Sequence, residues 1–198
     1  MASAYFLPLS ANARAIEERA IQIKHAYGFS PYDLIDPVAL ADRMSVPLVD
    51  PAWLDQLPAS VTDALLGPLA GTWSAGSLPV GGRLYVLLNP RHGVARQNIT
   101  LMEELVHEAL GHPPSTLTRE GSIAIRTCRR AVEEEAYAVA AALLMPYRST
   151  FNHLNAGLSI DSLPAGAEVS ADCRHSGSRL PGCGGWPRRG AVKRASRG

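Results

Sequence analysis

The sequence predicts a single α+β domain followed by a short basic tail. Apolar residues recur at helical spacing in four segments, and two runs of strand formers lie between the second and the third of these segments. Hydrophobic residues make up 46% of the 198 residues, which is enough to fill one core. The domain is expected to cover residues 1–161. From residue 162 to residue 198 Gly, Ser, Arg and Pro dominate, so this tail is expected to be poorly ordered.

Two helices are expected near the start of the chain. Apolar residues between Ser10 and Tyr27 repeat at helical spacing among charged ones, and Gly28 is placed to end the helix. A second helix is expected to begin at Asp36, whose side chain can cap a helix. The proline that follows it is tolerated in the first helical turn. This helix is expected to run to Met44.

A small sheet of about three strands is expected to follow. Residues 46–49 are a candidate edge strand, because Pro47 cannot donate a hydrogen bond to a sheet ladder. Residues 69–74 and 83–88 are rich in strand formers and are separated by a segment with several glycines and a proline. This pattern predicts a hairpin with a loose loop.

The principal helix is expected at residues 99–110, followed by Gly111 as its stop. Thr100 and Glu103 have the spacing of a capping box at its start. A last helix, residues 129–145, is rich in alanine after three glutamates and ends before a proline. Its small side chains permit close packing against a neighbouring helix.

The charge and the cysteines argue against several classes of protein. A net charge of +1 and a pI of about 7.8 give no electrostatic reason to expect nucleic acid or an anionic membrane as the partner. No run of about 18 apolar residues occurs, so no membrane span is expected. Three cysteines without a CxxC spacing fit a reducing compartment, and the protein is expected to be cytoplasmic. Nucleic-acid binding through the basic tail is a weaker alternative, because arginines among Gly and Ser are equally typical of a solvated end.

Two acidic residues and a histidine on the principal helix form a candidate metal site. Glu103 and His107 are four residues apart, so they lie on one helix face and can direct an oxygen and a nitrogen at one ion. Glu104 stands where helix-borne zinc peptidases have the carboxylate that takes a proton from water. One of the glutamates at residues 133–135 can supply the third ligand. The same residues are also typical of a solvated polar face and of a charged helix N-terminus, which is the alternative without a function.

A second register of the same helix gives another candidate site. His107, Glu108 and His112 are similar to the HExxxH motif of dipeptidyl peptidase III. Residues five apart point about 140° away from each other on a regular helix, so this register requires a bulge. Two other candidates are weaker: residues 72–76 lack the first glycine of a GxSxG motif, and Cys128 is more typical of an ordinary cysteine.

Several segments, which follow one another in the same order along the chain, resemble the ImmA/IrrE family of metallopeptidases over residues from about 11 to about 163. The resemblance is carried by Asn89 and Pro90, by the run from Arg96 to His107, by His112, and by the run from Glu135 to Pro146. It implies a zincin-like fold. It also implies that Glu104 is the general base, that His107 is a metal ligand and that Glu135 is the acidic ligand. Glu103 stands where the family has the first histidine of HExxH.

The altered ligand set bears on the identity of the metal. The side chains of Glu103, His107 and Glu135 are together more anionic and harder than two histidines and one glutamate. Zn²⁺ is the expected cofactor, with Mn²⁺ or no metal as the alternatives. Tyr137, where the family has Asn or Asp, is a smaller departure.

The expected function is zinc-dependent hydrolysis of peptide bonds. The resemblance implies a cytoplasmic transcriptional repressor or another regulatory protein as the substrate. The strand at residues 83–88 is expected to align this substrate by edge pairing. The alternative is a non-catalytic, metal-poor module of the same fold that only binds a regulator.

Overall fold

A computed structural model describes residues 8–113, 116–120, 123–127 and 129–159 of the chain. The predicted tail, residues 162–198, and Cys128 lie outside these residues. The fold is α+β, as predicted. In chain order the elements are α1 (Ala11–Ala26), α2 (Pro37–Met44), a 3₁₀ helix η1 (Pro51–Gln56), α3 (Ala59–Leu66), β1 (Ala75–Val80), β2 (Arg83–Leu88), α4 (Val94–Ala109), β3 (Thr116–Glu120), β4 (Ile123–Thr127), α5 (Arg130–Leu144) and α6 (Tyr147–Asn155).

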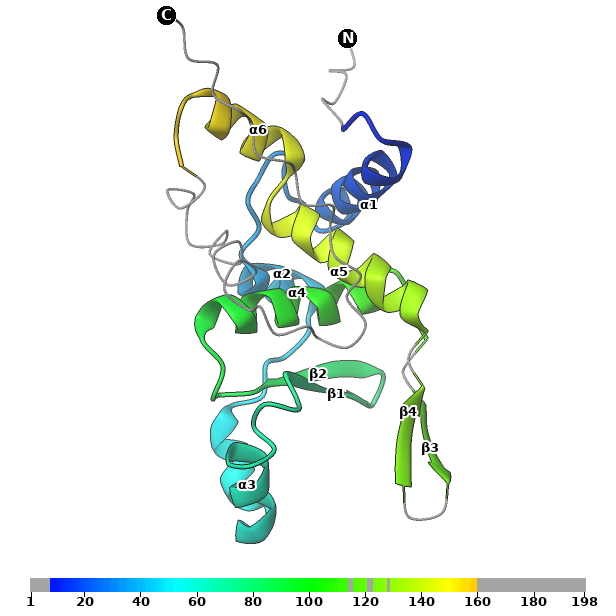
Figure 1. The fold of residues 1–198 in the computed structure, drawn as a ribbon, viewed down its shortest axis with the longest axis vertical. Helices are drawn as coiled ribbons and strands as arrows, with labels where there is room; N and C mark the ends of the chain where they lie inside the picture. The colour runs from blue at the N-terminus through cyan, green and yellow to red at the C-terminus, as the bar shows by residue number, and fades with distance from the viewer. Residues whose placement is uncertain (1–7, 114–115, 121–122, 128, 160–198) are drawn as a thin grey trace, which may run out of the picture.

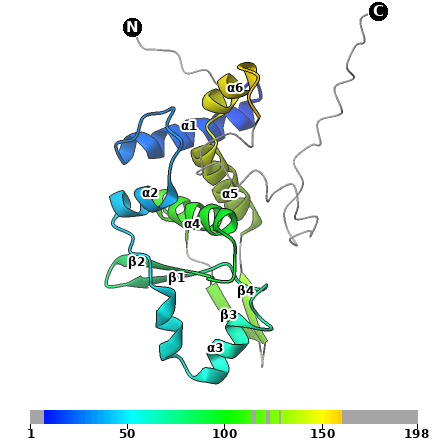
Figure 2. The same ribbon diagram turned by 90° about the vertical axis from the view of Figure 1, so that its left-hand side faces the viewer.

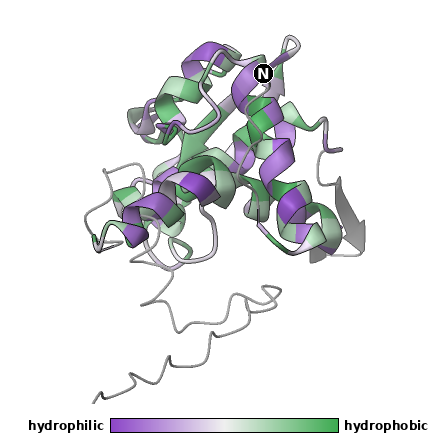
Figure 3. Cartoon of the chain, turned by 90° about the horizontal axis from the view of Figure 1, so that it is seen from above, coloured by the Kyte–Doolittle hydropathy of each residue, from purple (hydrophilic) through white to green (hydrophobic). Residues whose placement is uncertain are grey.

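Helix α4 lies at the centre of the structure. It contacts α2 and α5 on one side and the β1–β2 hairpin on the other, while α1 packs against α5 (Figure 1). Turning the molecule by 90° shows the hairpin between α4 and α3 (Figure 2). The helices carry both polar and apolar residues, as amphipathic helices do (Figure 3). Their apolar side chains meet in one core, whose fully buried members include Leu40, Val86, Leu101, Met102, Leu105, Val106, Val139, Ala140, Leu143 and Leu144.

The first two helices begin and end as predicted, and their caps give the reason. The Ser10 side chain accepts a hydrogen bond from the backbone N–H of Ala13 at 3.1 Å, and Gly28 follows α1 with a φ of +74°, which favours glycine. The Asp36 side chain accepts from the N–H of Val38 at 3.1 Å and so caps α2.

The sheet differs from the prediction in the position of its first strand. Strand β1 covers Ala75–Val80, whereas residues 69–74, the predicted strand, form turns and irregular structure. The predicted loop therefore contains the strand. Gly81 and Gly82 both have positive φ and form the two-residue turn between Val80 and Arg83, a geometry that glycine permits.

The third strand is present only as a single bridge. Leu48 pairs in parallel with Val86 of β2, and the N–H of Val49 donates to the Val86 carbonyl at 2.9 Å. Strand β2 therefore lies between this segment and β1, and β1 is the outer strand. A proline at position 79 is tolerated there because an outer strand does not need every N–H for pairing.

Helix α4 begins five residues earlier than the predicted start at Ile99, and the predicted capping box is wrong. Thr100 lies inside the helix and is buried, while Gly93 is the N-cap. The apolar pattern does not include the first turn, because polar side chains of this turn bind other segments of the chain. Arg96 donates to the Ser74 hydroxyl at 3.1 Å, and Gln97 donates to the Asn89 carbonyl at 2.9 Å. Helix α5, Arg130–Leu144, matches its prediction closely.

Lys24 on α1 is buried beneath the chain that leads to α2. The residue is only 1% exposed. Its Nζ donates hydrogen bonds to the carbonyls of Pro31 at 3.1 Å and of Asp33 at 2.9 Å. Burial lowers the pKa of Lys24 from 10.5 to about 8, against the opposing effect of the negative charges of Glu17 and Asp33. Between these two pKa values the unfolded chain binds the proton and the folded chain does not.

This difference predicts how stability changes with pH. Because the unfolded state binds more protons in this interval, the contribution of Lys24 to the free energy of unfolding rises as the pH increases from about 8 towards 10.5. Urea unfolding of the parent and of Lys24→Met at about pH 7 and about pH 9.5 measures it. The parent is expected to gain about 2 kcal/mol relative to the variant at the higher pH. An equal difference at both pH values would contradict the buried location of the amine.

Candidate functional site

The end of α4 and the beginning of α5 lie side by side and carry the candidate site. Ala136 and Ala140 of α5 are almost completely buried in the same core as Leu105 and Val106 of α4. Small side chains let the two helices approach closely, and the pair makes the most extensive contact between any two of the described helices. The glutamates in the first turns of α5 are thereby brought to the last two turns of α4.

Glu103 occupies a largely buried position one turn before His107. Burial raises the pKa of the Glu103 carboxyl to about 8, and the negative charges of Glu104 and Glu133 raise it further in the same direction. The carboxyl is therefore protonated near neutral pH. Burial is the main cause of this shift, and the two neighbouring carboxylates add to it.

Glu104, the predicted general base, faces the hairpin. The Ser77 hydroxyl on β1 donates a hydrogen bond to Glu104 Oε2 at 2.5 Å. This contact fixes one oxygen of the carboxylate beside the outer strand of the sheet. Glu104 is therefore the member of the predicted site that lies next to a strand edge.

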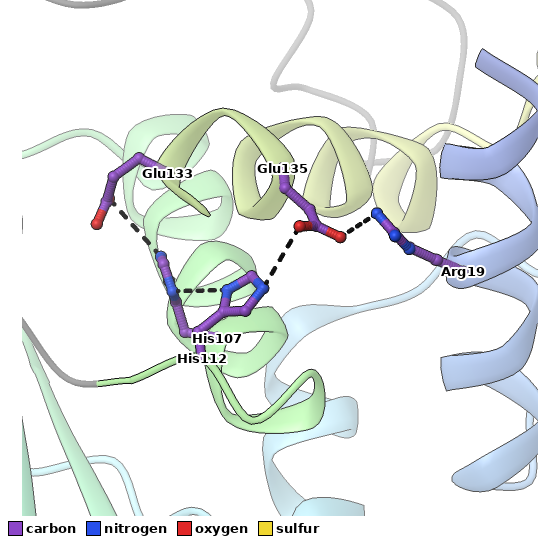
Figure 4. Close-up of polar contacts among 5 residues, drawn as sticks. All are labelled: Arg19, His107, His112, Glu133 and Glu135. Carbon is purple, nitrogen blue, oxygen red and sulfur yellow. Dashed lines mark hydrogen bonds and ion pairs between the residues drawn. The ribbon is translucent and has the colours of Figure 1, made fainter. Parts of the chain in front are cut away.

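His107 and His112 face each other at the end of α4 (Figure 4). Their Nδ1 atoms are 3.1 Å apart, and the rings meet edge to face with centroids 5.0 Å apart. His107 Nε2 lies 3.7 Å from Glu133 Oε2, and His112 Nε2 lies 3.8 Å from Glu135 Oε2. Two imidazoles, from α4 and from the turn after it, thus form one row with two carboxylates of α5.

Glu135, the predicted acidic ligand, also forms an ion pair with Arg19 of α1 (Figure 4). Glu103 and His107 both lie on α4, one turn apart, whereas Glu135 contacts Arg19 and His112. The carboxylate of α5 that lies beside His107 is that of Glu133. The sequence indicates Glu133 only as one of three consecutive glutamates. It gives no signal for Arg19, which lies 116 residues before Glu135 in the chain.

The second register does not need the bulge that a regular helix would require. Helix α4 ends at Ala109, and Gly111, with a φ of +63°, turns the chain back. The N–H of His112 donates to the His107 carbonyl at 2.9 Å. His112 therefore reaches His107 through the turn after the helix, while Glu108 between them is exposed.

The donors suit a divalent ion by their chemistry. Burial and the nearby carboxylates of Glu104 and Glu133 raise the pKa of Glu103, and a cation would offset the part that comes from these charges. Imidazole and carboxylate are common zinc ligands. Within the described ranges, however, no three histidine, cysteine, aspartate or glutamate side chains are arranged to hold a metal ion as they stand. Side-chain rotations would have to bring the donors together.

The comparison with family models gave one match. Residues 69–171 match the model of a peptidase family described as the IrrE N-terminal-like domain. The matched segment begins before β1 and includes α4, α5 and every residue of the candidate site except Arg19. The comparisons with curated proteins and with solved structures gave no match.

Replacing Glu103 by histidine is expected to tighten zinc binding, by about tenfold. The imidazole is neutral and ligates zinc well, whereas the parent carboxyl must first lose a proton that its burial retains. Competition for Zn²⁺ with a chromogenic chelator measures the change, with Glu103→Ala as the control that removes the donor. If Glu103→His binds zinc no better than Glu103→Ala, position 103 does not face the ion.

Proposed function

Because the chain belongs to the family of IrrE N-terminal-like peptidase domains, we propose that it is a zinc-dependent peptidase. The family supports a metallopeptidase-like domain. The observation that carries the finer proposal is the position of Glu104, which binds Ser77 of the outer strand β1 and lies on α4 between Glu103 and His107 in the sequence.

The ion in this proposal is held by Glu103 and His107 of α4 together with Glu135 of α5. Zn²⁺ is the proposed ion, and Mn²⁺ is the alternative because two of these three donors are carboxylates. When bound by three protein ligands, zinc lowers the pKa of water to about 7, which is the chemistry that peptide hydrolysis requires.

Glu104 acts in this proposal as general base and then as general acid. Its carboxylate accepts a proton from the attacking water and returns it to the nitrogen of the leaving amine. The hydrogen bond from Ser77 holds one carboxylate oxygen, so the side chain is oriented before the substrate arrives. Ser77 is thus a positioning residue for Glu104.

In this proposal the substrate pairs with β1 rather than with residues 83–88, the strand that the sequence favours. Strand β2 has β1 on one side, and on the other side its Val86 already pairs with the segment at Leu48. No other described strand pairs with the outer edge of β1. An extended peptide can add to this edge, with Leu78 and Val80 exposed for contact and Ser77 placing Glu104 near the backbone.

A regulatory protein, such as a transcriptional repressor, is the proposed substrate, and the cytoplasm is the proposed location. This part of the proposal rests on the resemblance to the ImmA/IrrE family. None of the described helices has the length and apolar composition needed to cross a membrane.

The second candidate function is a non-catalytic module that binds a regulator. The specific observation in its favour is that Glu103 replaces a histidine and that the described donors do not yet surround one point. The metal content of the purified protein separates the two. Close to one zinc ion per chain after reconstitution and desalting supports the peptidase, and less than about 0.2 supports the module.

Glu104→Gln is expected to lower the rate of peptide hydrolysis by about 10²- to 10⁴-fold while leaving zinc binding and folding intact, because an amide cannot accept the proton of water. Cleavage of labelled casein and of a fluorogenic peptide library measures the rate. Glu108→Gln is the matched control: Glu108 lies on the same helix but is exposed. Loss of activity in Glu108→Gln with full activity in Glu104→Gln would identify the HExxxH register as the working one.

A further inference from the structure

Helices η1 and α3 form a lobe at one end of the molecule, residues 50–69, which we call the η1–α3 lobe. Figures 1 and 2 show α3 at the opposite end from α1 and α6. None of the lobe's residues belongs to the common core, and α3 buries none of its own. The Thr62 hydroxyl donates to the Leu54 carbonyl at 2.8 Å, so α3 packs against η1. The segment that matches the family begins only at the last residue of this lobe, so the family match does not explain it.

Large apolar side chains are exposed on the lobe and on the hairpin beside it. Three side chains of the lobe are between 40% and 45% exposed: Trp53, Val61 and Leu69. Successive strand residues point to opposite faces, and Ser77 of β1 reaches α4, so Leu78 and Val80 lie on the face away from α4. Figure 2 shows α3 on that side of the hairpin. Several exposed apolar side chains gathered on one side of a protein are typical of an interaction surface.

The charges of this part of the chain all have the same sign. Between Met44 and Gly82 the sequence contains three aspartates and no Lys, Arg, His or Glu. The aspartates are Asp50, Asp55 and Asp63 of the lobe, and all three are exposed. None of them forms a salt bridge with another described residue. The lobe therefore combines exposed apolar side chains with negative charge that no neighbour neutralises.

We infer that the η1–α3 lobe is a docking surface for a positively charged amphipathic segment of a protein partner. The apolar face of such a segment covers side chains such as Val61, and its lysines or arginines meet the aspartates at the rim. The inference depends neither on zinc nor on peptide hydrolysis.

The sign of the charge decides against other occupants of the lobe. A second copy of the chain that docked by the same surface would place the three aspartates opposite themselves, and like charges across an interface are unfavourable. Anionic membranes and nucleic acids are repelled in the same way, because their surfaces are negative. A basic protein segment satisfies both the apolar and the charged part of the surface.

Binding of a fluorescein-labelled peptide to the full chain tests the inference. The probe contains leucine and lysine in the pattern of an amphipathic helix, and two reference peptides replace its lysines by glutamate or its leucines by serine. Fluorescence anisotropy measures the dissociation constants. The parent is expected to bind the probe in the micromolar range and each reference peptide at least about tenfold more weakly. Added salt is expected to weaken binding of the probe.

Substitutions locate the peptide on the surface. Val61→Lys is expected to weaken binding of the probe by at least about tenfold, because it removes an apolar contact and adds a repelling charge. Val94→Lys is the matched control: Val94 is 64% exposed, but it begins α4 and lies outside the lobe, so binding is expected to stay within about twofold of the parent. Urea unfolding of both variants shows whether they have kept their fold.

Three results would overturn the inference: no binding of the probe to the parent, equal binding of the glutamate peptide, or equal weakening by Val94→Lys and Val61→Lys. Sedimentation of the parent tests the second copy as occupant. A dimer that Val61→Lys dissociates would assign the lobe to self-association and would also overturn the inference. Because none of these measurements requires zinc, their failure leaves the proposed peptidase unaffected.

Discussion

The close contact between α4 and α5 is the constraint on which the rest of the structure depends. Alanines at positions 136 and 140 leave space for Leu105 and Val106, so the two helices can approach each other. The same approach brings the glutamates of α5 to the histidines at the end of α4. Truncation of a buried leucine such as Leu105 to alanine would cost about 2 to 5 kcal/mol, in the contact that positions the donors.

The elements that could be predicted from the sequence are those with local signals. Helices α1 and α2 have side-chain caps next to an apolar period, and α5 has an alanine-rich run that ends at a proline. Strand β1 was misplaced because a glycine and a proline lie inside it, and these residues are tolerated only because the strand is on the outside of the sheet. The start of α4 was missed because its polar first turn is stabilised by Ser74 and Asn89, which lie earlier in the chain.

In the candidate site too, local spacing predicts some positions, whereas tertiary packing decides the others. The spacing of Glu103 and His107 predicts a shared helix face, and both residues lie on α4 as expected. His112 could not be placed by helical periodicity, because it belongs to the turn beyond the helix and reaches His107 through the backbone conformation of Gly111. The partner of Glu135 on α1 depends on tertiary packing, for which no spacing in the sequence provides a signal.

The ion pair between Arg19 and Glu135 has a consequence for the smallest unit that can work by itself. The segment that matches the family begins at residue 69, whereas α1 and α2 precede it and contribute Ala20, Ile23, Leu40 and Ala41 to the common core. A fragment cut at residue 69 would expose the faces of α4 and α5 that these helices cover, and Glu135 would lose its cationic neighbour. The N-terminal helices therefore belong to the folding unit itself and are not an appendage that can be exchanged or removed.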